Sequence, residues 1–295
     1  MSAALKTAGT LAPTTCRRLT MIGAGRMAEA LINGIISKEA LPADQVVVYD
    51  INAKVSANIS KKYGCVASNS MLDAITDSDV VILAVKPNNV TDVGKVIASA
   101  LSPKTTVVSV MAGVNMNTLS TTLNHRRIVR AMSNTPAFIS QGMTVWTGSQ
   151  ECTQENKDTV QQFFAAVGEE IYVSEEKYLD MATAISGSGP AYVMLMMEAL
   201  TDSGVHLGFP RDVAKKLAQQ TLLGTTMYSI NSDEIHLAKL RNDVTSPGGT
   251  TATALYELEA GGFRTVMSKA VWAAYRRALE LGGSDSNVGP GRSHG

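Results

Sequence analysis

Two short segments carry glycines and hydroxyl groups in patterns that could bind anionic ligands. Residues 23–28 read GAGRMA, a GxGxxA pattern that directly follows the apolar run Leu19–Ile22. Residues 243–252 read DVTSPGGTTA. Glycine lets a backbone approach a phosphate or a carboxylate closely, and the N–H groups at the start of a helix attract negative charge. These residues therefore predict the binding of a dinucleotide and of a small anion.

The GxGxxA pattern is informative because of its surroundings. Gly23 permits a tight turn, Gly25 lets the backbone approach a pyrophosphate, and Ala28 lets the following helix pack closely on the strand. The pattern by itself also occurs in purely structural strand-to-helix turns. Here it follows a predicted strand, opens a predicted helix, and is followed by Asp50 at the end of the next strand. That context favours dinucleotide binding over the structural alternative.

Asp50 bears on the choice of nicotinamide cofactor. A carboxylate at this position accepts hydrogen bonds from the adenosine ribose hydroxyls and repels a 2′-phosphate, so it favours NADH. Asn52 and Lys54 follow closely and could soften this preference. The residues therefore leave the choice between NADH and NADPH open.

Three further loops follow predicted strands, at the edge where ligands bind in open α/β sheets. These loops are residues 86–88, 111–113 and 132–136. Lys86 could meet a phosphate, although an isolated lysine is also typical of a solvated loop. Asn134 offers an amide at the depth of a nicotinamide, although an asparagine before Thr-Pro is equally typical of a turn.

The second segment predicts a turn that leads into a helix near Thr250, because Pro-Gly-Gly cannot lie inside a helix. The N–H groups of Gly248, Gly249 and Thr250, with the helix dipole behind them, form a site suited to a carboxylate. Ser246 and Thr251 add hydroxyl groups. The alternative is a helix start capped by an ordinary serine or threonine.

Other catalytic machinery is absent from the sequence. The four histidines show no metal-ligand spacing, and there is no Ser-His-Asp set or GxSxG motif. We therefore expect no metal site and no strong catalytic base.

The first half of the chain must position the glycine turn. It alternates strand-like apolar runs with helix-length segments, and its runs are continuous, as in strands buried on both faces. This predicts an α/β fold with an N-terminal Rossmann-type, doubly wound parallel sheet. The predicted strands are Leu19–Ile22, Val46–Tyr49, 65–67, 80–85, 106–110, 128–131 and 171–173, with helices at 28–36 and Ala53–Tyr63 among the segments between them.

The second half predicts an all-helical C-terminal dimerisation domain. Its predicted helices span residues 191–207, 210–228, 232–240, 251–258 and 265–281. We expect the methionines on the first of these helices, at positions 194, 196 and 197, to lie in a core or a subunit interface. The predicted divisions are a flexible leader (1–18), a dinucleotide-binding domain (19–176), a helical substrate and dimerisation domain (177–283) and a disordered tail (284–295).

The composition excludes several classes of protein. The 295 residues carry 26 basic and 26 acidic side chains, so the net charge is zero, and 45% of residues are apolar. A nucleic-acid binder is expected to be basic, and no apolar run approaches the roughly 20 residues that span a bilayer. We therefore expect a soluble protein with no nucleic-acid or membrane partner.

The compartment is less sharply defined. Three cysteines without a CxxC pair favour a reducing environment. The first 28 residues contain no acid, which is also typical of a mitochondrial transit peptide. We favour a frayed leader and a cytoplasmic protein, with a mitochondrial location as the alternative.

Several motifs together resemble pyrroline-5-carboxylate reductase. They are residues 185–192 (ISGSGPAY), 240–252 (LRNDVTSPGGTTA), 258–264 (LEAGGFR), 84–87 (AVKP) and 132–136 (MSNTP), in addition to the GAGRMA segment. The VTSPGGTT stretch is highly specific, and the resemblance extends from about residue 19 to residue 281.

The resemblance implies that the chain uses NADPH or NADH to reduce L-1-pyrroline-5-carboxylate to L-proline, the final step of proline biosynthesis. It also implies a homodimer through intertwined C-terminal helices, which in this family often assembles into larger rings. Thr251 would hydrogen-bond the imine nitrogen as the catalytic residue. Ser246 and the amides of Gly248, Gly249 and Thr250 would hold the carboxylate.

The cofactor would lie along residues of the glycine turn and of the neighbouring loops. The cofactor-binding set is Gly23, Ala24, Gly25, Arg26, Met27, Asp50, Ala84, Val85, Lys86, Pro87, Ala112, Gly113 and Asn134. Asp50 departs from family members that use a hydroxyl or a basic residue for a 2′-phosphate, so the cofactor preference stays undecided.

Two other functions compete with this interpretation. A β-hydroxyacid dehydrogenase resembles this architecture, but such enzymes place a catalytic lysine on the helix after their glycine-rich segment, and residues 191–198 contain none. A non-catalytic NAD-binding regulator or helical interaction module would keep GxGxxA but has no need of the SPGGTT turn.

Overall fold

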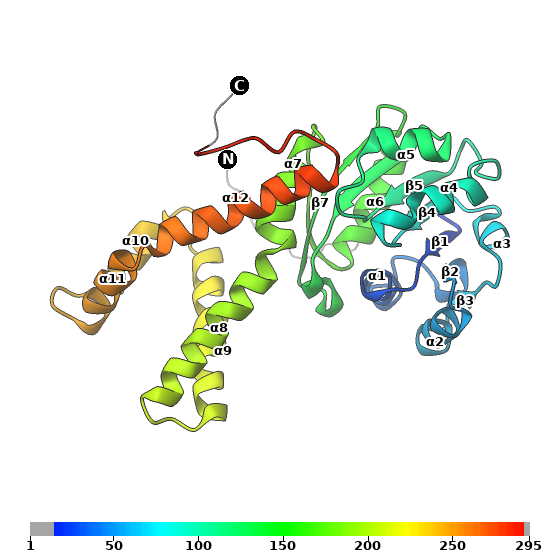
Figure 1. The fold of residues 1–295 in the computed structure, drawn as a ribbon. Helices are drawn as coiled ribbons and strands as arrows, with labels where there is room; N and C mark the ends of the chain where they lie inside the picture. The colour runs from blue at the N-terminus through cyan, green and yellow to red at the C-terminus, as the bar shows by residue number, and fades with distance from the viewer. Residues whose placement is uncertain (1–14, 292–295) are drawn as a thin grey trace. The chain divides into compact units, whose positions relative to one another are not determined.

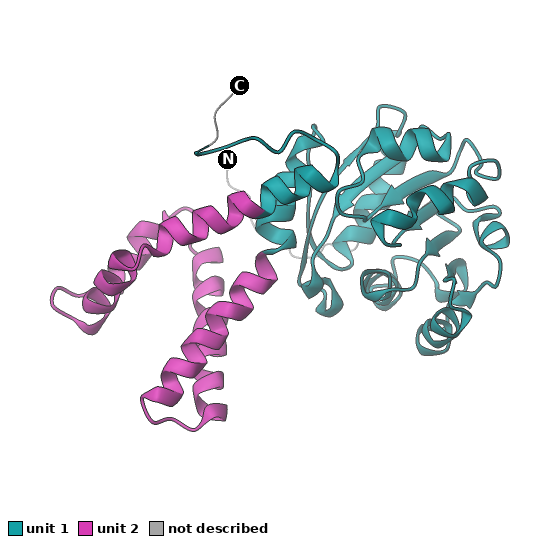
Figure 2. Ribbon diagram, viewed as in Figure 1, with its two compact units in different colours: residues 1–188, 274–295 teal, residues 189–273 magenta. Residues whose placement is uncertain are grey.

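The computed structural model describes residues 15–291 and divides the chain into two compact units (Figures 1 and 2). Unit 1 comprises Met1–Ser188 and Ala274–Gly295, and unit 2 comprises Gly189–Ala273. Most of the predicted leader (residues 1–14) and the end of the predicted tail (residues 292–295) lie outside the described residues. Residues 284–291 form neither helix nor strand.

Unit 1 is built around an eight-stranded sheet with the order β3-β2-β1-β4-β5-β6-β7-β8 (Figure 1). The strands are β1 (Leu19–Ile22), β2 (Val46–Tyr49), β3 (Val66–Ala67), β4 (Val80–Leu83), β5 (Thr106–Ser109), β6 (Ile128–Met132), β7 (Gly142–Gly148) and β8 (Gly168–Tyr172). The order of the first six strands is that of the Rossmann fold. The predicted doubly wound sheet is therefore confirmed.

Strand β7 departs from the prediction. No strand is predicted from the sequence at residues 142–148, and the sheet is predicted to be parallel, yet β7 pairs antiparallel with β6. The connection between the two strands runs through the 3-10 helix Thr135–Ile139. Such a connection is too short for the crossover of a dozen or more residues that a parallel neighbour requires.

Helices cover both faces of the sheet. They are α1 (Arg26–Ser37), α2 (Ala53–Tyr63), α3 (Met71–Ile75), α4 (Val90–Ile97), α5 (Met116–Leu123), α6 (Gln154–Ala165) and α7 (Lys177–Ala182), followed by a π-helix at Thr183–Gly187. One core layer joins α1 and α6 to the sheet through Leu31, Phe163 and Phe164. The other joins α3, α4 and α5 to it, with Ile97 and Leu119 fully buried.

Unit 2 contains α8 (Gly189–His206), α9 (Arg211–Ile230), α10 (Leu237–Asp243), α11 (Thr250–Ala260) and the first part of α12 (Phe263–Leu281). Four of the five predicted helices are confirmed. The prediction of a helix over residues 232–240 is wrong at its start, because the Ile235 N–H closes a turn onto Ser232. Helix α10 begins only at Leu237, where His236 Nδ1 accepts a hydrogen bond from the Ala238 N–H.

Unit 2 buries very little of its own apolar surface. Within it, only Thr201, Ala214, Ala218 and Leu240 are buried. Its exposed apolar side chains include Met194, Leu195, Leu217, Leu223, Met227, Tyr256, Leu258 and Val266. Among the described residues, no helix combines the length and apolar character needed to cross a membrane.

Candidate active site

The glycine turn lies at the switch point of the sheet, where β1 is flanked by β2 on one side and β4 on the other. Gly23 has a φ of +96°, and its N–H donates a hydrogen bond of 2.8 Å to the Tyr49 carbonyl of β2. A Cβ at Gly23 would lie 2.7 Å from the Ala84 carbonyl oxygen after β4. The fold therefore requires glycine at this position.

Gly25, unlike Gly23, has free space around its Cα. It is the N-cap of α1 with a φ of −71° and no side-chain cap, and a Cβ placed on it would meet no atom within 4 Å. Arg26 is exposed, Met27 is half-buried, and Ala28 is fully buried against the sheet. Uncapped N–H groups beside open space fit the pyrophosphate of a dinucleotide. The residues present thus match the cofactor that the sequence predicted.

Asp50 is held firmly at the end of β2. Its Oδ2 accepts a hydrogen bond of 2.8 Å from the Ala24 N–H, and its Oδ1 accepts one of 2.9 Å from the Asn52 N–H. The Asn52 side chain in turn caps α2 by accepting from the Lys54 N–H. This cap uses only the Oδ1 of Asn52, and the predicted softening of the Asp50 preference by Asn52 and Lys54 stays a prediction.

The loops after β4 and β5 lie beside the glycine turn along the same edge of the sheet. Ala84 and Val85 are half-buried, whereas Lys86 and Pro87 are exposed at the start of the 3-10 helix Pro87–Asn89. The Ala84 N–H donates to the Ile22 carbonyl at 2.8 Å, which ties the first of these loops to β1.

In the loop after β5, Ala112 is half-buried, while Gly113 is buried with a φ of +73°.

Asn134 has structural contacts on both ends of its amide. Its Oδ1 accepts a hydrogen bond from the Met143 N–H at 2.9 Å, and its Nδ2 donates to the Ser186 carbonyl at 3.0 Å. Through these bonds, Asn134 stabilises its own loop and the π-helix. One Nδ2 hydrogen remains available for a ligand. Its predicted contact with the cofactor stays a prediction.

The second predicted segment forms the turn that opens α11. Gly248 has a φ of +68°, and the N-cap of the helix is Gly249, which carries no side-chain cap. The alternative of a serine or threonine cap is therefore wrong. The Gly249 N–H donates to the Ser246 carbonyl at 3.0 Å, so this amide is already used within the turn.

The remaining donors of this turn are open to a ligand. Within the described part of the chain, the N–H groups of Gly248, Thr250 and Thr251 have no hydrogen-bond partner. The side chains of Ser246 and Thr250 are exposed, and that of Thr251 is half-buried. A turn of N–H groups and hydroxyls at a helix start can hold a small carboxylate without a basic side chain.

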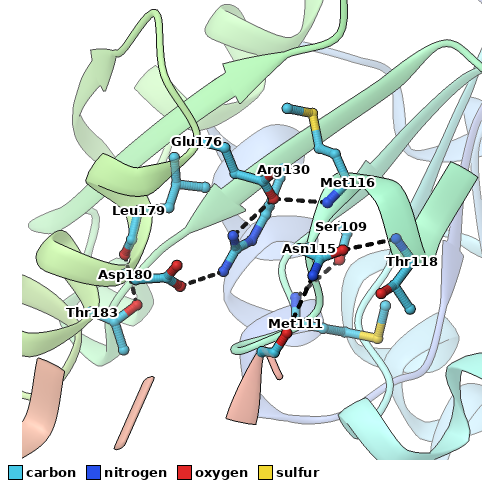
Figure 3. A network of polar contacts seen from close by, with 11 residues as sticks. Ser109, Met111, Asn115, Met116, Thr118, Arg130, Glu176, Leu179, Asp180 and Thr183 are labelled. Atoms are coloured by element: carbon cyan, nitrogen blue, oxygen red, sulfur yellow. Dashed lines mark hydrogen bonds and ion pairs between the residues drawn. The ribbon is translucent and has the colours of Figure 1, made fainter. Parts of the chain in front are cut away.

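One polar cluster in unit 1 was not predicted. Arg130 lies in the otherwise apolar strand β6 and forms ion pairs with Glu176 and Asp180 (Figure 3). Glu176 directly precedes α7, and Asp180 lies within it. A charged residue inside the run IVRAM was the signal in the sequence, because a buried arginine needs partners. Residues 15–291 contain no group of three metal-ligating side chains.

A Rossmann-type sheet with an open glycine turn at its switch point, followed in the chain by a helical unit, is typical of an NAD(P)-dependent oxidoreductase. Comparison with known proteins agrees. Residues 18–113 match the family described as NADP oxidoreductase, coenzyme F420-dependent, and residues 176–281 match the family described as pyrroline-5-carboxylate reductase dimerisation.

The relatives define the family more narrowly. The chain is 39% identical to a pyrroline-5-carboxylate reductase of Glycine max, over 91% of this chain and 97% of the relative. It is 38% identical to one of Pseudomonas aeruginosa, over 90% of this chain and 96% of the relative.

A solved pyrroline-5-carboxylate reductase of Coxiella burnetii is 34% identical, with a TM-score of 0.84 over 91% of this chain and 99% of that one. The Plasmodium falciparum enzyme, solved with NADP bound, is 30% identical, with a TM-score of 0.83 over 92% and 100% of the two chains. The chain belongs to the pyrroline-5-carboxylate reductase family.

Proposed function

We propose that this protein reduces L-1-pyrroline-5-carboxylate to L-proline with NADH or NADPH, the final step of proline biosynthesis. The observation that carries the proposal is the turn before α11, whose N-cap is an uncapped glycine with two threonines directly behind it. Relatives at 38–39% identity over almost the whole chain are named for this activity.

The cofactor-binding residues belong to unit 1. The amides of the glycine turn at the start of α1 would hold the pyrophosphate, and Asp50 would accept from the adenosine ribose. The loops with Ala84–Pro87, Ala112–Gly113 and Asn134 would continue the site toward the nicotinamide. The bound nicotinamide supplies the hydride for the reduction.

The substrate-binding residues lie in unit 2. The amides of Gly248 and Thr250, with the Ser246 hydroxyl, would hold the substrate carboxylate, and Gly249 would join them if its bond to Ser246 opens. The Thr251 hydroxyl would hydrogen-bond the imine nitrogen. A protonated imine is already electrophilic, so the protein needs to orient it and exclude water, and it needs no general base.

The decisive experiment is an assay of the purified protein with pyrroline-5-carboxylate and each nicotinamide cofactor, following nicotinamide oxidation. We expect turnover, and we expect Thr251→Ala to lower it about tenfold or more while the Kd for the cofactor stays unchanged. Thr253→Ala, on the same helix, is the matched control, because the Thr253 hydroxyl already donates to the Gly249 carbonyl at 3.4 Å and has no proposed contact with the substrate. Absence of turnover with both cofactors would contradict the proposal.

We also propose that the protein is a homodimer through its C-terminal helices, on which larger rings can be built. The exposed apolar side chains of α8, α9 and α11 support this, since a second copy would remove them from water. The match of residues 176–281 to a dimerisation family supports it as well. In this scheme, residues 19–176 bind the cofactor and residues 177–283 bind the substrate and dimerise.

The reaction is proposed to take place in the cytoplasm, with the mitochondrion as the alternative. Support comes from the cysteines, since Cys65 and Cys152 are buried thiols and form no disulfide, as a reducing compartment favours. Cell fractionation of the full-length chain distinguishes the two compartments.

A further inference from the structure

Arg130 is almost completely buried and has two carboxylate partners. Its side chain is 4% exposed, its Nη1 lies 2.8 Å from Glu176 Oε1, and its Nη2 lies 2.7 Å from Asp180 Oδ1 (Figure 3). Asp180, which is 14% exposed, is by itself a sufficient counter-ion. The second carboxylate, Glu176, therefore calls for an explanation other than the neutralisation of Arg130.

Glu176 connects the buried pair to the start of α5. The same Oε1 that accepts from Arg130 also accepts a hydrogen bond of 2.7 Å from the Met116 N–H. Met116 is the first residue of α5, where a backbone N–H has no partner within the helix and where negative charge is favourable. Glu176 thus acts as a distant cap for α5, together with Asn115, whose side chain accepts from the Thr118 N–H at 2.8 Å.

This cap fixes one end of the loop between β5 and α5. At the other end, the Met111 N–H donates to Ser109 Oγ at 3.3 Å. The end of the loop at α5 is also held by Gly282, which directly follows α12, because Asn115 Nδ2 donates to the Gly282 carbonyl at 3.2 Å. A Cβ at Gly113 would lie 2.7 Å from that of Leu281. Ala112 and Gly113 are the two predicted cofactor contacts of this loop.

We infer that Glu176 is a positioning residue, which sets the β5–α5 loop in the conformation that receives the cofactor while Arg130 holds the Glu176 carboxylate in place. The inference rests on the proposed function, because it takes the loop as part of the cofactor site. Asp180 has no bond to the loop and serves only to pair Arg130. The two carboxylates therefore have different expected effects although both contact the same guanidinium group.

The test compares Glu176→Ala with Asp180→Ala as the matched control. Both variants remove one carboxylate from Arg130, so both should lower the Tm. Only Glu176→Ala should weaken NADH binding, by about tenfold, when binding is followed by quenching of the intrinsic fluorescence. Only Glu176→Ala should also speed amide hydrogen exchange over residues 111–118 of the cofactor-free protein.

Glu176→Gln separates the hydrogen bond from the charge. Its amide oxygen can still accept from the Met116 N–H, so we expect NADH affinity close to that of the unchanged protein. If Glu176→Ala fails to fold, the same comparison is made between Glu176→Met and Asp180→Leu, which replace each carboxylate by an apolar group that cannot accept a hydrogen bond. The loss of loop protection is then expected only for Glu176→Met, since Asp180 does not contact the loop.

The inference is overturned if Glu176→Ala leaves NADH affinity and amide exchange unchanged, or if Asp180→Ala changes both by the same amount. Neither readout uses pyrroline-5-carboxylate. Failure of the reductase assay with normal NADH binding would therefore count against the proposed function and leave the role of Glu176 standing.

Discussion

The two compact units differ in how they bury apolar side chains. Unit 1 encloses Trp146, Phe163 and Phe164 at 2% exposure or less, between a sheet and its helices. Unit 2 fully buries no aromatic residue, and its one large buried aliphatic side chain is Leu240. Burying one leucine or methionine side chain contributes about 1.5–3 kcal/mol, so the exposed residues of unit 2 represent a large unused driving force.

This difference indicates that the two halves are stabilised in different ways. Unit 1 has a core layer on each face of its sheet, built from its own residues. Unit 2 consists of helices whose apolar faces require a partner surface, and the homodimer proposed above supplies it. Core substitutions should therefore act on unit 1 at any protein concentration, whereas surface substitutions in unit 2 should act through assembly.

The largest expected effect is on the core of unit 1. Phe163→Ala should lower the free energy of unfolding of this unit by about 3–5 kcal/mol, because the ring is 0% exposed. In a Trp272→Phe background, urea unfolding followed by Trp146 fluorescence reports on unit 1. Leu223→Ala in unit 2, where the side chain is 56% exposed, should leave that transition unchanged. Equal shifts for the two variants would remove the contrast between the units.

The next effect is on assembly. Met194 is 63% exposed on α8, so Met194→Glu should leave the single chain folded and weaken dimerisation about 100-fold, because a charge would enter an apolar interface. Sedimentation velocity over a range of concentrations measures this. Val96→Glu, on an exposed apolar site of unit 1, is the control and should not change the oligomeric state. A stable monomer before any substitution would refute the proposed dimer.

A smaller effect separates cofactor binding from stability at the glycine turn of unit 1. Gly25→Ala should keep or slightly raise stability, since the backbone angles and surroundings of Gly25 accept a methyl group, and it should raise the Kd for NADH about tenfold by narrowing the approach to the pyrophosphate. Fluorescence titration gives the Kd, and thermal unfolding gives the stability. Gly23→Ala, in contrast, should destabilise the fold itself. Unchanged NADH affinity in Gly25→Ala would place the pyrophosphate elsewhere.

The smallest expected effect concerns cofactor choice within unit 1. Asp50→Asn removes a charge that the Ala24 and Asn52 amides hold at the ribose position. The ratio of kcat/KM with NADPH to that with NADH should rise about fivefold, because the carboxylate no longer repels a 2′-phosphate. Steady-state kinetics with both cofactors measures the ratio. An unchanged ratio would show that Asp50 does not set the preference.

The sequence predicted the two halves of the fold correctly. The continuous apolar runs at Leu19–Ile22 and Val46–Tyr49 indicated buried parallel strands, and the glycine pattern between them predicted the turn at Gly23. In these segments, the types of neighbouring residues are sufficient to predict the backbone conformation. The start of α10 was predicted five residues too early, because residues 232–236 form a turn whose last residue, His236, caps the helix.

What the sequence alone determined are features that depend on neighbouring residues: the periodicity of strands and helices, the backbone freedom of Gly23 and Gly248, and the motifs that identify the family. Only the tertiary structure decided features that join distant parts of the chain. These include the antiparallel β7, the bond from the Ala24 N–H to the Asp50 carboxylate, 26 residues away, and the bond from the Met116 N–H to Glu176, 60 residues away. These contacts form because the packing of the tertiary structure brings the residues together, and a local sequence pattern contains no information about that packing.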